Sequence, residues 1–311
     1  MIKKFKKIIN LIVRENIFKY LNSKNETNSK NFPNIAFPAF DVIGPHISTY
    51  GRFENNELKV LENKVFSKID SSKSTCLDIG ANIGNHSIFF SNFFLNVYSF
   101  EPQPDNYYLL KFNTRKFENI KTFPIGSSDT DEIKILYTPN PNNLGFSTLD
   151  GEGLENEKRV DKKYQFNSEV KVELKNLDNF LNTNKEEKIS FIKIDVEGHE
   201  YKSLVGLKNV IDKSSPIIAL EQFVSQFDKI KKTSQSINLL KKYGYEHFYE
   251  PEFFQRKKGK NKFLRFFNKL YYYLQIFFNE KKIDTYSLKK IENFKIKSYP
   301  MILASKFDLL K

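Results

Sequence analysis

The sequence predicts an α/β fold with a mainly parallel sheet. Short apolar segments alternate with segments of helical periodicity from about residue 75 to residue 249. Several of the apolar segments end in an acidic residue or a glycine, which is typical of strands at the ligand-binding edge of an open α/β sheet. A chain of 311 residues is long enough to bury the core that such a sheet requires.

The segment before the first strand is expected to contain two helices. Apolar residues recur at helical spacing over residues 2–21, which predicts a basic amphipathic helix. The polar stretch 22–31 has the composition of a linker. Residues 33–70 form a lead-in to the sheet, with a helix expected over residues 57–67.

From residue 75 onward, strands and helices are expected to alternate. Pro104 suits the first turn of a helix, and Gly244 fits the residue that ends one. Strands are predicted over 75–79, 96–100, 120–125, 132–137, 169–174, 189–194, 216–221, 245–249 and 300–304, with helices over 83–94, 104–116, 177–181, 201–211 and 226–243.

Positive charge is concentrated in two segments of the chain. The formal net charge is +13, of which residues 1–22 contribute +5 and residues 253–283 contribute +8. The remaining body is formally neutral, so its charge does not predict a nucleic-acid-binding surface. We expect three parts: a basic helix and linker over 1–31, a catalytic domain over 32–251 and 297–311, and a basic aromatic helical insertion over 252–296.

Cysteine usage and hydropathy bear on the cellular compartment. The single Cys76 excludes an internal disulfide, so nothing indicates an oxidising compartment. No segment approaches the roughly 18–20 apolar residues that a membrane span needs. The apolar run after Lys7 is short and is not followed by a cleavage site of small residues. We expect a cytoplasmic protein.

The loop after the first predicted strand has the features of a cofactor site. Gly80 and Gly84 let a ligand approach the backbone, and Asp78 places a carboxylate beside it. A dinucleotide site would have a glycine where Asn82 stands, and Asp78 would repel a phosphate group. S-adenosylmethionine carries an ammonium and a sulfonium and no phosphate. Glu101, at the end of the next strand, can accept hydrogen bonds from the ribose hydroxyls of a cofactor. Asp78 and Glu101 together therefore predict a site for S-adenosylmethionine.

A second acidic cluster follows the predicted strand 189–194. Asp195 is a candidate for the cofactor amine or the acceptor, and Glu197 or His199 is a candidate general base. An alternative interpretation of these acids is a helix N-terminus, where the helix dipole favours them. Glu221 ends another strand at the same edge, and with Asp195 it could hold a divalent ion. A base acting without a metal is the simpler account.

Four motifs, taken together, resemble those of the FkbM-type methyltransferases. They are DIGANIGNHS from Asp78, FEPQPDN from Phe100, LDNF from Leu177 and IKIDVEGHEY from Ile192. The resemblance covers about residues 45–250 and the final strand. It implies a class I methyltransferase fold, with a seven-stranded sheet whose last strand runs antiparallel and helices on both faces. It also implies transfer from S-adenosylmethionine, usually to a hydroxyl oxygen of a sugar, glycan or natural product.

The same resemblance assigns residues to the cofactor. It places Asp78, Gly80 and Asn82 at the methionine end, Glu101 at the ribose and Asp129 near the adenine. Further residues of these motifs complete the expected cofactor site: Ala81, Gly84, Asn85, Pro102 and Asp195. Upstream, His46, Tyr50 and Glu54 are candidates to cap the site, and residues 143–148 resemble a loop over the acceptor.

Two other functional classes compete with an enzyme acting on a glycan. The basic segments 1–22 and 253–283 suit an anionic membrane surface, which would fit a binding protein with a degenerate methyltransferase fold. Aromatic residues interleaved with cations also suit RNA. The neutral body and the absence of an Asn/Asp-Pro-Pro-Tyr/Phe motif for base methylation disfavour RNA. An intact cofactor loop argues against degeneration, so the basic segments are interpreted as a means of placing an enzyme, with peripheral contact to an anionic membrane as the candidate. The alternative for residues 253–283 is a helical insertion packed on the domain with a solvated basic edge.

Overall fold

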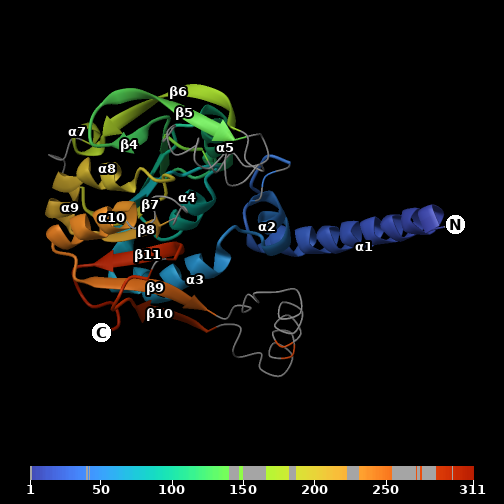
Figure 1. The fold of residues 1–311 in the computed structure, drawn as a ribbon. Helices are drawn as coiled ribbons and strands as arrows, with labels where there is room; N and C mark the ends of the chain where they lie inside the picture. The colour runs from blue at the N-terminus through green and yellow to red at the C-terminus, as the bar shows by residue number, and fades with distance from the viewer. Residues whose placement is uncertain are drawn as a thin grey trace.

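The structure is a computed structural model with a sheet-centred body and one long projecting helix (Figure 1). It describes residues 2–39, 41, 43–139, 147–149, 166–181, 187–222, 231–253, 271, 274, 285–295 and 297–311. Most of the basic aromatic segment 253–283 and the expected acceptor-loop residues 143–146 lie outside this part of the chain.

The body is built on an eight-stranded sheet with the strand order β10-β9-β11-β8-β7-β1-β2-β3. The neighbouring pairs from β8 to β3 are parallel, whereas β11 runs antiparallel to both β8 and β9, and β10 runs antiparallel to β9. The strands are β1 (Thr75–Ile79), β2 (Asn96–Phe100), β3 (Ile120–Phe123), β7 (Ile189–Ile194), β8 (Ile217–Gln222), β9 (His247–Phe253), β10 (Tyr286–Lys290) and β11 (Tyr299–Ser305).

The order of the strands locates the ligand-binding edge of the sheet. From β1 the chain continues to β2 and β3 on one side, and later to β7 and β8 on the other side. The strand order therefore reverses between β1 and β7, where ligands bind in open α/β sheets, at the carboxyl ends of the strands. The mainly parallel α/β fold and the antiparallel last strand of the class I methyltransferase fold are confirmed.

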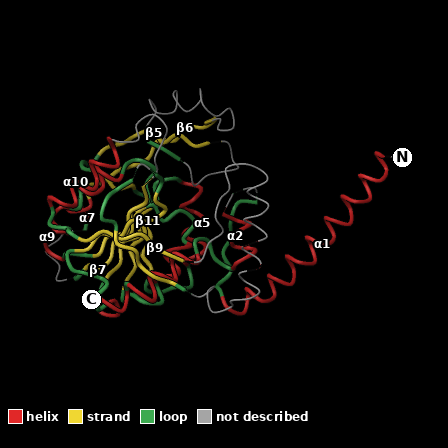
Figure 2. Tube along the Cα trace, turned by 60° about the horizontal axis from the view of Figure 1, so that its bottom comes forward, coloured by secondary structure: helices red, strands yellow, loops and turns green. Residues whose placement is uncertain are grey.

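Helices cover both faces of this sheet (Figures 1 and 2). Leu77 and Ile192 point to the face covered by α8, α9 and α10, and Cys76 and Phe191 point to the face covered by α3 and α4. The helices are α1 (Ile2–Asn31), α2 (Ile43–Tyr50), α3 (Asn55–Lys64), α4 (Asn85–Phe90), α5 (Pro104–Thr114), α7 (Leu177–Phe180), α8 (Glu200–Val205), α9 (Lys208–Ser214) and α10 (Lys231–Lys242), with short 3-10 turns η1 (Phe66–Lys68) and η2 (Ser71–Lys73).

A second, three-stranded sheet lies at the ligand-binding edge of the first (Figure 1). Its order is β4-β6-β5, formed by β4 (Gly126–Ser128), β5 (Glu132–Pro139) and β6 (Phe166–Asn176). The long pair β5 and β6 is antiparallel and buries Leu136, Val172 and Leu174 together. This small sheet supplies a wall to the cavity described below.

Several expectations from the sequence are wrong. The single helix expected over residues 201–211 is two helices, α8 and α9, and the lead-in contains the additional helix α2. The large sheet has eight strands rather than seven, because Tyr286–Lys290, expected within the helical insertion, pairs with β9 and buries Leu288. The expected linker 22–31 continues α1. That stretch contains no glycine or proline, so the helix is not interrupted, and the side chains of Thr27 and Asn31 donate hydrogen bonds to backbone carbonyls one turn earlier. The expected strand 120–125 ends at Phe123, and Gly126–Ser128 belongs to the small sheet instead.

Among the described residues, no helix is both long and apolar enough to cross a membrane. Helix α1 is long enough in residues, but its mean hydropathy is too low.

Candidate active site

A cavity of about 350 Å³ opens at the carboxyl ends of β1, β2, β7 and β8. Its volume lies within the roughly 300–1,000 Å³ range of small-molecule sites. Its walls combine backbone of the β1 loop, carboxylates from four segments and apolar side chains of the small sheet. The predicted site residues that line it are Glu54, Gly80, Asn82, Glu101, Pro102, Asp195, Glu197, His199 and Glu221.

The loop after β1 forms the floor of the cavity because Gly80 permits a very close approach of two strand ends. Gly80 has a φ of +78°, and a Cβ added there would lie 1.8 Å from the carbonyl oxygen of Asp195. The amides of Gly80 and Ala81 both donate to the carbonyl of Phe100, at 3.0 Å each. The loop is thereby fixed against the end of β2, and its backbone faces the cavity without an intervening side chain.

Glu101 is held at the end of β2 by two backbone amides. Its carboxylate accepts hydrogen bonds from the amide of Asn82 at 2.8 Å and from the amide of Gln103 at 2.9 Å. Burial raises its pKa to about 7, against the lowering effect of these two hydrogen bonds. The carboxylate that lines the cavity is therefore preorganised and is close to its titration point at neutral pH.

Asp78 lies below the cavity rather than in its wall, and a buried lysine lies beside it. Asp78 is fully buried, its Oδ2 accepts a hydrogen bond from Ser87 at 2.6 Å, and its Oδ1 is 3.8 Å from the Nζ of Lys193. Asp78 and Lys193 are register partners on β1 and β7, so they point to the same face of the sheet. Lys193 is not among the predicted site residues, although a single lysine inside the apolar strand 189–194 is itself a signal, because lysine is almost never buried without a partner.

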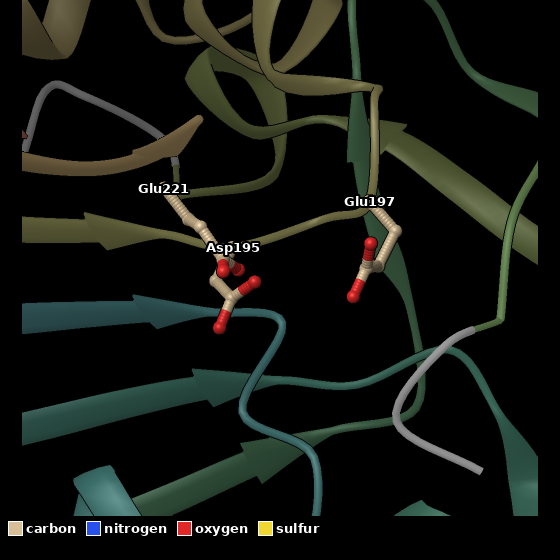
Figure 3. A group of neighbouring side chains, drawn as sticks. All are labelled: Asp195, Glu197 and Glu221. Carbon is tan, nitrogen blue, oxygen red and sulfur yellow. The ribbon is translucent and has the colours of Figure 1, made fainter. Parts of the chain in front are cut away.

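Three carboxylates converge at the ends of β7 and β8 (Figure 3). Oxygens of Asp195, Glu197 and Glu221 all lie within 4.8 Å of one another. Burial would raise the pKa of Asp195, but Lys193 at 3.0 Å and a hydrogen bond from Glu221 outweigh burial and lower it. Burial and the neighbouring Asp195 raise the pKa of Glu221 strongly, so Glu221 retains the proton of the pair at neutral pH. Such a cluster attracts a cation, either a cationic ligand or a divalent metal ion.

His199 is neutral at physiological pH. Burial, together with Lys134 and Lys202, lowers its pKa to about 4. Its Nε2 is 3.0 Å from the hydroxyl of Ser128 on β4. This contact joins the loop between β7 and α8 to the small sheet. This geometry gives His199 a structural contact at the cavity wall and makes it a weak base.

Asp129 does not line the cavity. Burial would raise its pKa, but a hydrogen bond from Ser128 and the ammonium of Lys202 at 3.6 Å lower it. Asp129 directly follows β4 and is not a lining residue, so its predicted place near an adenine has no direct contact with the cavity in this structure.

The lead-in before β1 closes one side of the cavity through Glu54 and Phe53. Glu54, with a φ of +51°, lies 3.1 Å from Nε2 of His86. The side chain of Asn85 exchanges two hydrogen bonds with the backbone of Phe53, at 3.0 and 3.1 Å. Asn85 therefore anchors the lead-in and does not line the cavity, and Gly84 precedes it at the start of α4.

The two other cap candidates lie outside the cavity. His46 packs its ring against those of Tyr50 and Phe53, and Tyr50 is 60% exposed.

The apolar wall of the cavity was not predicted. It consists of Leu136, Leu149 and Leu174, which the small sheet and the segment paired with Tyr137 bring together from positions up to 38 residues apart. Their sequence pattern indicates only strands, and nothing local indicates which face of those strands would meet the ligand-binding edge.

Comparison with known proteins identifies the domain. The model of the methyltransferase FkbM domain matches residues 78–247, which is more than half of the chain and runs from the last two residues of β1 to the first residue of β9. A search among curated proteins finds no match.

Several solved structures are similar at low sequence identity. An FkbM methyltransferase from Methylobacillus flagellatus is 16% identical, with a TM-score of 0.36 over 55% of this chain and 37% of the other. This chain thus spans little more than a third of that protein's length. A precorrin-6y C5,15-methyltransferase from Geobacter metallireducens is 13% identical over 88% and 98% of the two chains, with a TM-score of 0.36. A putative methyltransferase from Streptococcus mutans, solved with SAH, is 10% identical over 81% and 99%, with a TM-score of 0.40. These scores are too low to carry an argument, so the assignment rests on the domain match.

Proposed function

The chain belongs to the FkbM methyltransferase family, and from that premise we propose that it methylates a hydroxyl oxygen of a saccharide, glycan or related metabolite. Methyltransferase activity dependent on S-adenosylmethionine follows from the family. The hydroxyl acceptor, its carbohydrate nature and a cytoplasmic location are the proposal.

The observation that carries the proposal is the convergence of carboxylates from the ends of three strands on one cavity. Glu101 comes from β2, Asp195 and Glu197 follow β7, and Glu221 ends β8. Negative charge of this density favours a cationic ligand and disfavours a phosphate-bearing one. A carboxylate near its titration point also suits the removal of a proton from a hydroxyl.

The residues of the cavity fit S-adenosylmethionine. Gly80 lines the cavity without a side chain, and the side-chain oxygen of Asn82 is buried at the cavity without a hydrogen-bond partner. Glu101 offers carboxylate oxygens to hydroxyl donors, and the Asp195 cluster offers negative charge to an amine. When bound, the cofactor supplies a methyl group on a positively charged sulfur, which is an intrinsically good leaving group.

The chain's own contribution is then to bind, to align and to accept a proton. Asp195 is kept ionised by Lys193, so it supplies fixed negative charge rather than basicity. Glu197 and Glu221 are the stronger candidates for the base, because their carboxylates face the same space. Glu221 holds a proton before the cofactor binds, so it can accept one from the acceptor only after the cationic cofactor has displaced that proton. His199, with its pKa of about 4, is assigned to the wall and not to the base.

A divalent ion at the carboxylate cluster stays the second account of the chemistry. The three carboxylates satisfy the spacing, but Lys193 already offsets part of their charge. We retain the metal-free base as the simpler assignment.

The proposal is tested with methyl-labelled cofactor and the full chain. Labelled product should form in a glycan or lipid-linked glycan fraction, and it should form with a chelator present. Glu101→Gln should weaken cofactor binding in calorimetry by about tenfold or more, the loss of one to two charge-assisted hydrogen bonds.

Different failures of this experiment contradict different parts of the proposal. Unchanged cofactor affinity in Glu101→Gln would refute the site assignment. Label in RNA or protein alone would refute the acceptor class. Tight cofactor binding with no label transferred to any fraction would favour a binding protein over an enzyme.

A further inference from the structure

We propose that helix α1 binds an anionic lipid surface and holds the enzyme at the membrane. Within the part of the chain that the structure describes, the helix is anchored near its C-terminal end, where Asn28 donates a hydrogen bond to the carbonyl of Ser48 on α2 at 3.2 Å. Every residue from 6 to 20 is exposed, and the helix projects away from the body (Figures 1 and 2). A helix that packed on its own domain would bury an apolar stripe, and this one does not.

The exposed apolar side chains of α1 require a partner other than water. Ile8, Ile9, Ile12 and Val13 follow the spacing i, i+1, i+4 and i+5, so they lie on one face, and they are 43–54% exposed. Lys7, Asn10 and Arg14, at i, i+3 and i+7, lie on the opposite face. Phe18, the most exposed of the apolar residues of α1 at 67%, extends the apolar surface beyond one face. A lipid interface accommodates such a broad apolar surface better than a narrow protein groove.

Charge selects an anionic lipid surface among the possible partners. The helix Ile2–Asn31 contains eight Lys or Arg and two Glu, which gives a net charge of +6. Pairing with a second copy of α1 would bring two such charges together. An anionic bilayer instead attracts them, and long lysine and arginine side chains keep their charges at the headgroups while their stems cover apolar surface.

The helix is expected to lie in the plane of the interface rather than across the bilayer. It does not have the length of continuous apolar sequence that a span requires, and its basic residues are distributed along it. The apolar face would then enter the boundary between headgroups and acyl chains, with the body on the aqueous side. This inference does not depend on the identity of the methyl acceptor.

The test uses flotation of the full chain with vesicles of phosphatidylcholine, with and without phosphatidylglycerol. The unaltered chain should float with the anionic vesicles, and added salt should weaken its binding. The variant K6Q/K7Q/R14Q/K19Q should bind at least about tenfold more weakly, because each of the four lost charges contributes to the attraction. The variant I8Q/I9Q/I12Q/V13Q should also lose binding, since it removes the inserted face.

A matched control removes the same charge from the body. K64Q/K68Q/K111Q/K116Q replaces four exposed lysines outside α1 and should bind vesicles like the unaltered chain. Equal thermal unfolding midpoints for all variants would show that the fold is intact. The proposal is overturned if the unaltered chain does not float, if the body variant loses as much binding as the α1 variants, or if both α1 variants bind normally. A lipid-free dimer in sedimentation that both α1 variants abolish would overturn it in favour of self-association.

Discussion

The side-chain nitrogen of Lys193 lies 3.0 Å from Oδ2 of Asp195, two residues further along the same chain segment. The same nitrogen lies 3.8 Å from Oδ1 of Asp78 on the adjacent strand. One buried cation therefore compensates two carboxylates, of which one lies below the cavity and the other lines it. Because burial would lower the lysine pKa and these carboxylates instead raise it, the ammonium stays charged throughout the neutral range.

Replacing Lys193 by methionine is expected to destabilise the fold strongly. Two carboxylates would be left without their buried cation, and removal of one partner from a buried pair costs about 3–5 kcal/mol. Since the pKa of Lys193 is raised, its contribution is fully present below the ordinary lysine value of about 10.4. Denaturant unfolding of Lys193→Met should show this loss equally at mildly acid and mildly alkaline pH.

Two variants separate the charge from the packing of Lys193. Lys188→Met changes an exposed lysine just before the same strand and should be nearly neutral. The double variant K193M/D78N should recover part of the stability, because it removes one of the uncompensated carboxylates. Absence of any recovery would show that the lysine acts through packing.

Gly80→Ala is expected to separate the ends of β1 and β7. Both a positive φ and a clash oppose the substitution, since the new Cβ would lie 1.8 Å from the carbonyl oxygen of Asp195. Gly198→Ala is the matched control: its φ is +96°, but nothing lies within 4 Å of the added atom. The control should lose only the backbone cost of about 1–2 kcal/mol.

The difference between the two glycine variants isolates the close approach of the strands. Gly80→Ala should lose clearly more stability than Gly198→Ala and should lose cofactor binding in calorimetry. Equal losses in the two variants would mean that the strand ends separate without cost and that the tight floor is not needed.

Sequence reasoning located the site because strand ends are local features. An acidic residue lies at the carboxyl end of each of four apolar strands: Asp78, Glu101, Asp195 and Glu221. The carboxyl ends of parallel strands meet at one edge of a sheet. The same reasoning did not indicate that Asp78 is buried beneath the loop, since that depends on the registry of β1 with β7 and on the lysine between them.

The parts that the sequence did not predict depend on tertiary contacts. Leu136 and Leu174 face the cavity only because β5 and β6 form a sheet of their own. Strand β10 is too short and too charged to differ from a loop until it pairs with β9. The continuation of α1 through residues 22–31 is different, because the sequence contains its signal: this polar stretch has no glycine or proline to end the helix.

His199 is expected to make the protein less stable in acid. Burial, Lys134 and Lys202 lower its pKa to about 4. Between that value and the pKa of the unfolded chain, the unfolded chain therefore binds a proton that the folded chain does not bind. The resulting stability is complete above the unfolded pKa of about 6.5 and is lost as the pH falls toward 4, by at most about 3 kcal/mol at 1.4 kcal/mol per pKa unit. His199→Gln should flatten this part of the profile of unfolding free energy against pH. An unchanged profile would contradict the buried neutral imidazole.

The proton held between Asp195 and Glu221 predicts that cofactor binding depends on pH. Burial and Asp195 raise the pKa of Glu221, so the empty site holds this proton at neutral pH. A cationic ligand beside the pair favours the ionised form, and binding should therefore release a proton. By linkage, affinity should rise with pH, by up to about tenfold for each pH unit below the raised pKa.

Calorimetry of S-adenosylmethionine binding in buffers of different ionisation enthalpy measures this proton directly. Measurements between about pH 6 and pH 7 avoid titration of the ligand's own α-amino group, whose ordinary pKa is about 7.7–8.0. Glu221→Gln keeps the shape of the side chain and removes the titrating group, so it should release fewer protons and show a weaker dependence of affinity on pH. Glu101, with its pKa of about 7, accounts for the proton release expected to persist in Glu221→Gln. The double variant E101Q/E221Q should abolish proton release. Equal proton release by the unaltered chain and Glu221→Gln would show that the Asp195–Glu221 pair is ionised before the ligand arrives.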